Sequence, residues 1–347
     1  MTKLVKRLNV TGKLIFKSRQ KFILFILFTF CVVVSLSSLA SGSFNLPLFE
    51  LFFGAASEIE REVFFEIRMP RVLLAAIVGF SLGITGASLQ GLFRNPLADP
   101  GLIGVSAGAA FGAVAAIVIF SNLALGVNFG TYLVPFAAII GSMFVIILVY
   151  LLTGRFSQID VAYMLLVGIA LNALATVGIG LFTFISTDSE LRGLTFWMMG
   201  SFGAARWDLV LPSMIVLLSA AFWMVSYSRR LDIIQLGEIE AGRLGVDTKK
   251  IKIAVILSSS ILVGLSVALA GIVGFIGLVV PHLVRILGGP HHRFLLPASA
   301  LMGAALTVTA DLVSRIIIQP AELPVGLVTS ALGAPFFLWL IIRFNSH

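Results

Sequence analysis

Arg68-Met69-Pro70-Arg71 opens an apolar stretch of this chain, and Arg94-Asn95-Pro96-Leu97-Ala98-Asp99-Pro100 closes it. Two arginines bracket a proline where the stretch begins, and two prolines bracket a polar turn where it ends. The apolar residues between them number about 20, which is the length that an α-helix needs to cross the hydrocarbon core of a bilayer. Gly101-Leu102-Ile103-Gly104 follows at once and starts the next apolar stretch. The pattern predicts a membrane protein with several spans.

Composition supports the same fold class. The chain has 347 residues, of which 59% are hydrophobic and 12% charged, and its mean hydropathy is +1.08. A soluble domain carries about 25% charged residues, so this chain lacks the charge to cover a surface that faces water. The net charge of +8 is not gathered with aromatic residues on a soluble module, so no nucleic-acid partner is predicted. The sequence has one cysteine, Cys31, which excludes an internal disulfide and a cysteine-rich metal site.

Basic residues precede the first apolar run, which extends from Phe22 to about Ala40. A signal peptide has a shorter core of about 7–15 residues and ends at a cleavage site of small residues. We therefore expect residues 1–21 to be a basic cytoplasmic tail and the apolar run to be an uncleaved first membrane helix. Residues 22–343 are expected to form a single transmembrane domain.

Charge-poor stretches divide the rest of the chain into spans. The stretch 100–154 is too long for one helix and is expected to break near 126–131, with Pro135 starting the next helix. The stretch 253–284 fits either one tilted helix or two short ones, and the glycines in its middle favour a turn there. The expected spans are 22–49, 72–93, two within 100–154, 161–187, 209–228, two within 253–284, 294–310 and 323–342.

Positive charge orients these spans. With ten spans and a cytoplasmic N-terminus, 18 of the 24 Lys and Arg residues lie on the cytoplasmic side, as the positive-inside rule expects. Nine spans would place Arg285 and Arg293 outside and weaken this bias. The predicted fold class is therefore an all-α polytopic membrane protein of about ten transmembrane helices, with both termini cytoplasmic. Glycines at every fourth residue (Gly79 and Gly83, then Gly104, Gly108 and Gly112) predict close helix packing in two spans.

Ionisable residues are nearly absent from the spans. Asp160 and Asp311 lie near predicted helix ends, and Asp311 is one helical turn before Arg315, a spacing that suits an ion pair. No span carries a glutamate, lysine or histidine at mid-depth, which a proton-driven or sodium-driven carrier usually has. The sequence contains no phosphate-binding loop, zinc-protease motif or Ser–His arrangement, so the chain itself is not predicted to hydrolyse ATP or to hold a cofactor.

Histidines gather between His282 and His292, and a metal or haem site is one interpretation of them. His291 and His292 lie beside Gly288-Gly289-Pro290, which favours a solvated inner loop instead. No metal site is therefore predicted.

A polar segment, residues 229–252, interrupts the apolar pattern on the inner side and predicts two short helices around glycine breaks. Leu236, Ile239 and Leu244 provide apolar contact points among its charges. Docking on a partner and an ordinary connecting loop are equally compatible with this composition.

Arg68, Arg71 and Arg315 are expected at the outer ends of their spans. If those ends are adjacent, the arginines form a basic rim for acidic residues of an external partner. Interfacial arginines whose charged ends reach toward water are the alternative.

Five blocks in order carry a family resemblance: Arg68–Arg71, Gly86–Val105, Phe196–Ser201, Gly274–Arg285 and Ala321–Pro335. Spread over most of residues 65–343, they resemble the FecCD-type permease subunits of ABC importers for iron chelates, haem and vitamin B12. The resemblance implies a type II ABC importer permease in the bacterial inner membrane. Implied partners are a second copy of the chain, two cytoplasmic ATP-binding subunits that use the ATP, and a periplasmic substrate-binding protein.

The same resemblance assigns residues to roles. Arg68, Arg71 and Arg315 match the arginines that grip the binding protein. Contacts with the ATP-binding subunits fall in the coupling loop 229–252, at Leu236, Gly237, Glu238, Ala241, Leu244 and Gly245. The fifth and tenth helices are expected near the substrate path, where Asn172 and Thr176 are either polar groups of the path or packing residues.

Substrate identity rests on short segments. Leu191–Trp197 looks most like haem permeases, and Trp197–Gly200 also resembles the vitamin B12 branch. Haem is favoured, followed by a ferric siderophore and then by cobalamin. A secondary transporter of another class and an intramembrane enzyme are rivals. The recognised blocks argue against the first, and the lack of a buried nucleophile–base pair argues against the second.

Overall fold

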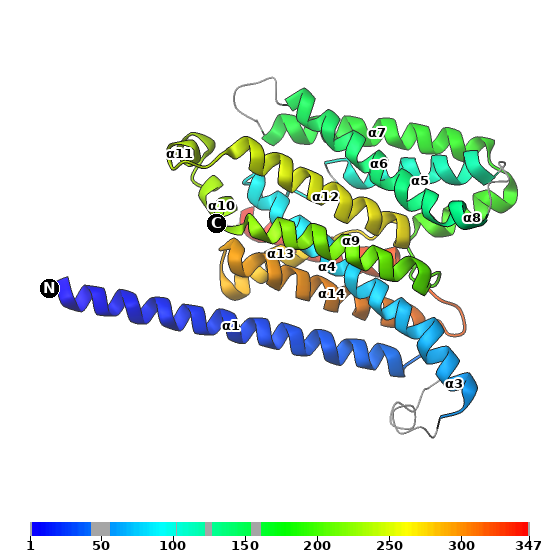
Figure 1. Ribbon diagram of the computed structural model, residues 1–347, viewed down its shortest axis with the longest axis horizontal. Helices are drawn as coiled ribbons and strands as arrows, with labels where there is room; N and C mark the ends of the chain where they lie inside the picture. The colour runs from blue at the N-terminus through cyan, green and yellow to red at the C-terminus, as the bar shows by residue number, and fades with distance from the viewer. Residues whose placement is uncertain (1, 43–55, 102, 122–126, 154–160, 346–347) are drawn as a thin grey trace.

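The structure is a computed structural model that describes residues 2–42, 56–101, 103–121, 127–153 and 161–345. Within these ranges the chain forms helices joined by turns and contains no β-strand (Figure 1). The helices are α1 (Thr2–Ala40), α3 (Glu58–Glu62), the π-helix η1 (Val63–Arg68), α4 (Met69–Leu92), α5 (Val105–Ser121), α6 (Val127–Thr153), α7 (Val161–Ile185), α8 (Asp188–Met198), α9 (Trp207–Ser226), α10 (Ser228–Ile234), α11 (Glu238–Arg243), α12 (Thr248–Ala270), α13 (Ile276–Gly288), α14 (His292–Ile316) and α15 (Val325–Asn345).

Each expected span holds an apolar helix within the described ranges, and the number that cross a membrane stays a prediction. Seven are long and apolar enough to cross a membrane, and three shorter ones lie in α5, α13 and α15. The N-terminus of α1 and the C-terminus of α15 lie at the same end of the bundle as α10 and α11 (Figure 1). The cytoplasmic location of that end stays a prediction.

Three boundaries differ from the sequence prediction. Helix α1 begins within the predicted basic tail, at Thr2, and ends at Ala40 rather than at residue 49. Helix α6 begins at Val127, so Pro135 lies inside it and does not start it. A proline removes one backbone donor, and apolar helices of this kind tolerate it when neighbouring helices enclose the site.

The stretch 253–284 forms two helices, as its glycines predicted. Helix α12 ends at Ala270, and α13 begins at Ile276. Gly271 has a φ of 68°, and a Cβ there would lie 1.9 Å from the carbonyl oxygen of Trp197. Only glycine fits that position, because both the backbone conformation and the close approach exclude a side chain.

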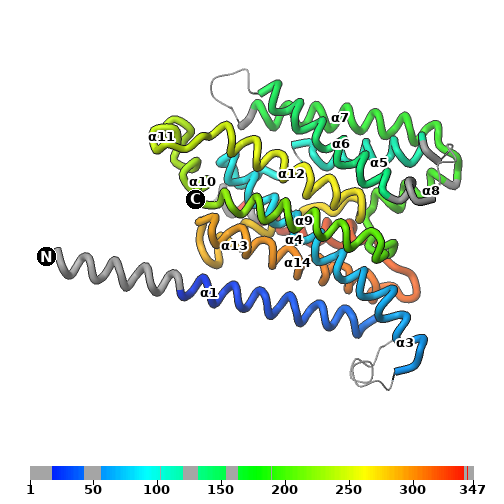
Figure 2. The backbone as a smooth tube through the Cα atoms, viewed as in Figure 1, coloured from blue at the N-terminus to red at the C-terminus, as the bar shows by residue number. Residues whose placement is uncertain are grey.

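Helix α4 lies at the centre of the bundle, against α12, α13 and α14 (Figure 2). Nearly all of its side chains are buried. The backbones come very close: a Cβ on Gly79 would lie 2.3 Å from the oxygen of Gly303, and a Cβ on Gly86 would lie 1.8 Å from the oxygen of Gly277. The glycine spacing in this span therefore marks close helix packing, as predicted.

A second close contact joins α5 and α6. A Cβ on Gly108 would lie 2.5 Å from the oxygen of Gly141, and a Cβ on Gly112 would lie 2.2 Å from the oxygen of Ala137. Helices α5, α6 and α7 form one edge of the bundle, and α1 runs along the opposite edge beside α14 (Figure 1). Close glycine contacts thus join α4 to α13 and α14 at the centre of the bundle and α5 to α6 at its edge.

Candidate functional site

Arg68, Arg71 and Arg315 come together at the end of the bundle opposite α10 and α11, and they surround Asp311 and the C-terminus of α1. Their residues are only 5%, 8% and 6% exposed, and Asp311 is fully buried. An exposed basic rim is therefore wrong for this conformation, because groups of the same chain occupy the guanidinium donors. Whether an external partner engages them stays a prediction.

Arg71 binds two carboxylates. Its Nε and Nη2 donate to Asp311 Oδ1 at 3.0 and 2.9 Å. Its Nη1 lies 2.9 Å from an oxygen of Glu322, whose side chain is 47% exposed. Glu322 stands in the turn between α14 and α15, and sequence reasoning missed its role although it lies in a recognised block. Arg71 thus joins a buried carboxylate to one that meets solvent.

Arg315 and Arg68 bind the end of α1. Arg315 contacts Asp311 Oδ2 at 3.2 Å, which confirms the predicted ion pair. It also donates to the carbonyl oxygens of Ser38 and Ser41, and Arg68 donates at 2.8 Å to those of Leu39 and Ala40. The last carbonyls of a helix lack partners within the helix and carry partial negative charge. Two arginines therefore satisfy the end of the first span.

At the opposite end, residues 229–252 form the two short helices predicted from sequence, α10 and α11. Gly237 and Gly245 lie at the breaks with φ values of 113° and 77°, which glycine adopts readily. Leu236, Ile239 and Leu244 are between 61% and 64% exposed, whereas Ala241 is buried. The surface thus presents large apolar side chains on a polar segment, and such a patch is typical of a docking surface.

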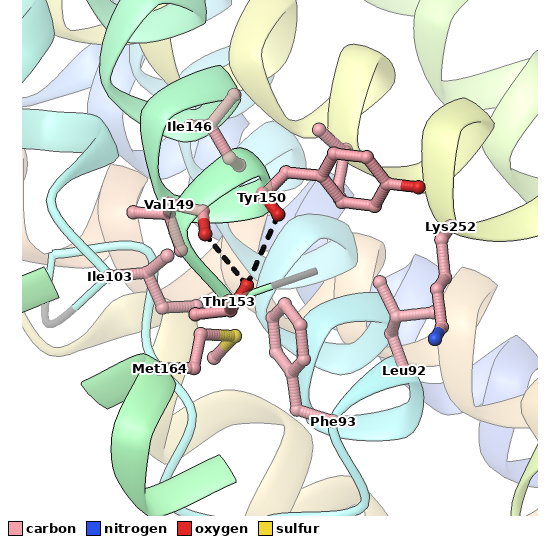
Figure 3. Close-up of a pocket in the computed structure, with 10 residues that line it drawn as sticks. Leu92, Phe93, Ile103, Ile146, Val149, Tyr150, Thr153, Met164 and Lys252 are labelled. Atoms are coloured by element: carbon pink, nitrogen blue, oxygen red, sulfur yellow. Dashed lines mark hydrogen bonds between the residues drawn. The ribbon is translucent and has the colours of Figure 1, made fainter. Parts of the chain in front are cut away.

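Glu238 ties α11 to α12 through Lys252. The amino group lies 2.6 Å from the carboxylate, and the Lys252 side chain is only 11% exposed. The stem of Lys252 lines a small cavity with Leu92 at the end of α4 (Figure 3). Thr153 also lines it and donates its hydroxyl to the carbonyl oxygens of Val149 and Tyr150 (Figure 3). Helix α11 is therefore attached to α12 beside the end of α4.

Helix α10 is attached to α4 and α14 as well. Gln235 donates to the carbonyl oxygen of Gly91 at 2.7 Å. Asp232 accepts from the backbone N–H of His292 at 2.9 Å, and its Oδ1 lies 2.7 Å from Nδ1 of the same residue. Burial raises the pKa of Asp232, but the hydrogen bonds from His292 outweigh it and hold the pKa below its ordinary value. The carboxylate therefore stays charged at neutral pH.

The expectation of solvated histidines holds for His291 and is wrong for His292. His291 is exposed, whereas His292 is 2% exposed because Asp232 and the end of α4 cover it. Across the described residues, no group of three or more His, Cys, Asp or Glu side chains is arranged to hold a metal ion.

The polar residues proposed for the substrate path lie on α7. Asn172 Nδ2 donates to the carbonyl oxygen of Gly101 at 2.9 Å, and Thr176 donates to the carbonyl oxygen of Asn172 at 2.8 Å. Both contacts fit helix packing, so a role in the path stays a prediction. Asp160 lies outside the described residues.

A sequence profile of the FecCD transport family matches residues 27–343. The chain belongs to this family. The hemin transport system permease protein HmuU of Yersinia pestis is 43% identical over 312 residues, which are 90% of this chain and 92% of that protein. The vitamin B12 import system permease protein BtuC of Vibrio cholerae is 40% identical over 84% of this chain and 86% of that protein.

A solved structure has the same fold. It is a metal-chelate type ABC transporter in an inward-facing conformation, and it matches with a TM-score of 0.82 and 33% identity over 93% of this chain and 99% of its own. This FecCD-family chain is therefore a multi-pass permease of a metal-chelate, haem or vitamin B12 type ABC importer. In such transporters separate subunits hydrolyse the ATP.

The buried ion cluster predicts unequal effects of neutralising its two carboxylates. Asp311→Asn removes the buried ion-pair partner of two guanidinium groups, leaves Arg71 with Glu322 alone, and should cost about 3 kcal/mol or more of unfolding free energy. Glu322→Gln removes a half-exposed pair and should cost about 1 kcal/mol or less. Thermal unfolding of the purified permease in detergent measures both. Equal losses would contradict the central position of Asp311.

Proposed function

We propose that this permease moves an iron chelate, with haem favoured, from a periplasmic binding protein across the bacterial inner membrane. Two copies of the chain would form the path, and two cytoplasmic ATP-binding subunits would drive it. The observation that most supports this proposal is that the chain is 43% identical to a hemin transport permease over 90% of its length. The vitamin B12 permease follows at 40%, so cobalamin is the alternative substrate within the family, and a ferric siderophore ranks between the two.

The ATP-binding subunits would dock on the surface formed by Leu236, Ile239 and Leu244. These side chains are exposed, and the glycines beside them leave room for a partner: a Cβ at Gly245 or Gly242 would meet no atom within 4 Å. Movement of this surface would reach three core helices through the contacts already described. These are Glu238 with Lys252 on α12, Gln235 with Gly91 on α4, and Asp232 with His292 on α14.

The binding protein would dock at the other end, on Arg71. Asp311 is fully buried, so it stays in place when a partner arrives. Glu322 is half-exposed and holds only Nη1 of the same guanidinium, so an external carboxylate would replace it there. Docking then exchanges one carboxylate for another and leaves the buried ion pairs intact, which explains how a buried arginine can still serve an external partner.

The second copy of the chain would cover α7 and α15. Leu174, Val177 and Leu181 are between 62% and 67% exposed and follow one face of α7. Leu332 and Leu338 on α15 are similarly exposed. Large apolar side chains on helices that neighbour a path fit contact with a partner copy or with lipid, and Asn172 and Thr176 would add polar groups at the edge of that face.

Substrate choice can be measured directly. The permease, its ATP-binding subunit and its binding protein are reconstituted in liposomes, and ATP-dependent uptake of haemin, a ferric hydroxamate siderophore and cyanocobalamin is compared. We expect haemin uptake to be at least tenfold faster than that of the other two. Fastest uptake of cyanocobalamin would overturn the assignment of haem as the substrate. Equal uptake without the ATP-binding subunit would overturn the ATP-driven mechanism.

Docking by exchange predicts that Glu322→Gln strengthens binding of the binding protein. The variant removes an internal competitor whose half-exposed ion pair contributes about 1 kcal/mol or less, so the gain is roughly two- to fivefold. Surface plasmon resonance with the detergent-solubilised permease measures it. Asp208→Asn is the matched control, because Asp208 is also partly exposed and ion-paired, to Arg206. Weaker binding of the Glu322→Gln variant would exclude the exchange.

If the ATP-binding subunits dock on the surface formed by Leu236, Ile239 and Leu244, the Leu244→Glu variant should uncouple transport from ATP hydrolysis. A charge at a desolvated apolar contact should weaken association with the ATP-binding subunit by about tenfold or more. Co-purification and uptake in liposomes measure the effect. Ile59→Glu serves as the control, because Ile59 is 69% exposed on α3 at the other end of the bundle. Normal association of the Leu244→Glu variant would rule out this surface.

A further inference from the structure

A polar cavity of about 410 Å³ lies between the end of α4, the short helix α10 and the α13–α14 turn. The proposed transport mechanism does not use it. Its polar lining consists mainly of Arg94, Asn95, Gln235, Arg285, His291 and His292, together with Gln90 and Asp232. Donors outnumber acceptors in this set, since arginine only donates and the carboxylate of Asp232 is already bound by His292.

Two nitrogens of residues that line the cavity have no hydrogen-bond partner among the described residues. Arg285 uses Nη2 to bind the side-chain oxygen of Gln90, but its buried Nη1 has no hydrogen-bond partner among the described residues. His292, only 2% exposed, likewise has no partner there for Nε2. An unsatisfied buried polar group costs about 1–3 kcal/mol, and more when it is charged. Because Nδ1 of His292 faces a carboxylate, the unmet donor is that of Arg285, and an acceptor beside it, an anion above all, would satisfy it.

Charge in the cavity is positive. Arg94 and Arg285 bring two permanent positive charges, and Asp232 is the one acidic residue in the lining. Arg94 is exposed at the mouth, whereas Arg285 is partly buried. A planar guanidinium offers paired donors that match the oxygens of a phosphate group, and two of them at one cavity form a strong oxyanion site.

We propose that this cavity binds a phosphate group, supplied either by an anionic phospholipid headgroup or by free phosphate. The cavity lies where α4 and α13 end and α14 begins, and membrane-spanning helices place their ends at the depth of the headgroups. Basic cavities between such helices are recognised sites for lipid phosphates. The bound group would accept from the guanidinium group of Arg285 and from that of Arg94 at the mouth.

Such a ligand would touch the coupling segment. Gln235 and Asp232 belong to α10, and both line the cavity while they bind α4 and α14. A phosphate group held by Arg94 and Arg285 would join the same three helices through a further set of contacts. The site thus connects the lipid or phosphate around the permease to the segment proposed to receive the ATP-binding subunits.

The test uses the full purified chain in detergent. Dihexanoyl phosphatidylglycerol, dihexanoylglycerol without phosphate, and inorganic phosphate are titrated separately, and the shift of the thermal unfolding midpoint gives the affinity of each. The variants are Arg94→Gln at the mouth and Arg285→Gln inside. The matched control is Arg293→Gln, because Arg293 is exposed and adjacent to His292 but does not line the cavity.

We expect phosphatidylglycerol to raise the midpoint and Arg94→Gln to weaken its binding about tenfold, with Arg293→Gln unchanged. Arg285→Gln should weaken it at least as much; if that variant does not fold, Arg94→Gln decides alone. A response to inorganic phosphate with the same dependence on Arg94 identifies free phosphate as the source. The proposal is overturned if neither phosphate compound raises the midpoint, if dihexanoylglycerol acts as well as the phospholipid, or if Arg94→Gln and Arg293→Gln behave alike.

Discussion

Contact between the backbones of α4 and α14 is the constraint on which the rest of the structure depends. Water does not drive helices together inside a bilayer, so their association relies on close packing. Gly79 and Gly83 of α4 face Gly303 and Ser299 of α14 at distances that leave no room for a Cβ. The two helices therefore form one central unit, and the surrounding spans are positioned by packing against it.

Both candidate interaction surfaces are attached to this unit. At one end, Asp311 of α14 binds Arg71 of α4 and Arg315 of its own helix, and Arg315 in turn binds the end of α1. At the other end, α10 binds Gly91 of α4 and His292 of α14. A displacement of α10 would be transmitted to both central helices, and these same helices carry the charged cluster on the far side. Coupling between the two ends therefore requires no separate connecting element.

Local sequence patterns predicted much of this fold, but they could not predict contacts between residues that lie far apart in the chain. Hydropathy located the spans, glycine spacing predicted their packing, and Gly237 and Gly245 predicted the two short helices. The burial of Arg68 was not predictable, because its partners are carbonyls at the end of a helix 28 and 29 residues earlier. His292 was misplaced for the same reason, since its partner Asp232 lies 60 residues away. The spacing of Asp311 and Arg315 is local, and their pairing was foreseen.

The sharing of Asp311 by Arg71 and Arg315 also constrains how this sequence can diverge. Loss of the carboxylate takes the buried ion-pair partner from two cations at once and leaves only the half-exposed Glu322 beside Arg71, whereas loss of one arginine leaves the other to neutralise Asp311. Substitution in this trio is therefore asymmetric, because changing one arginine costs less than changing the aspartate. Among descendants of this chain, the aspartate should be the last of the three positions to drift.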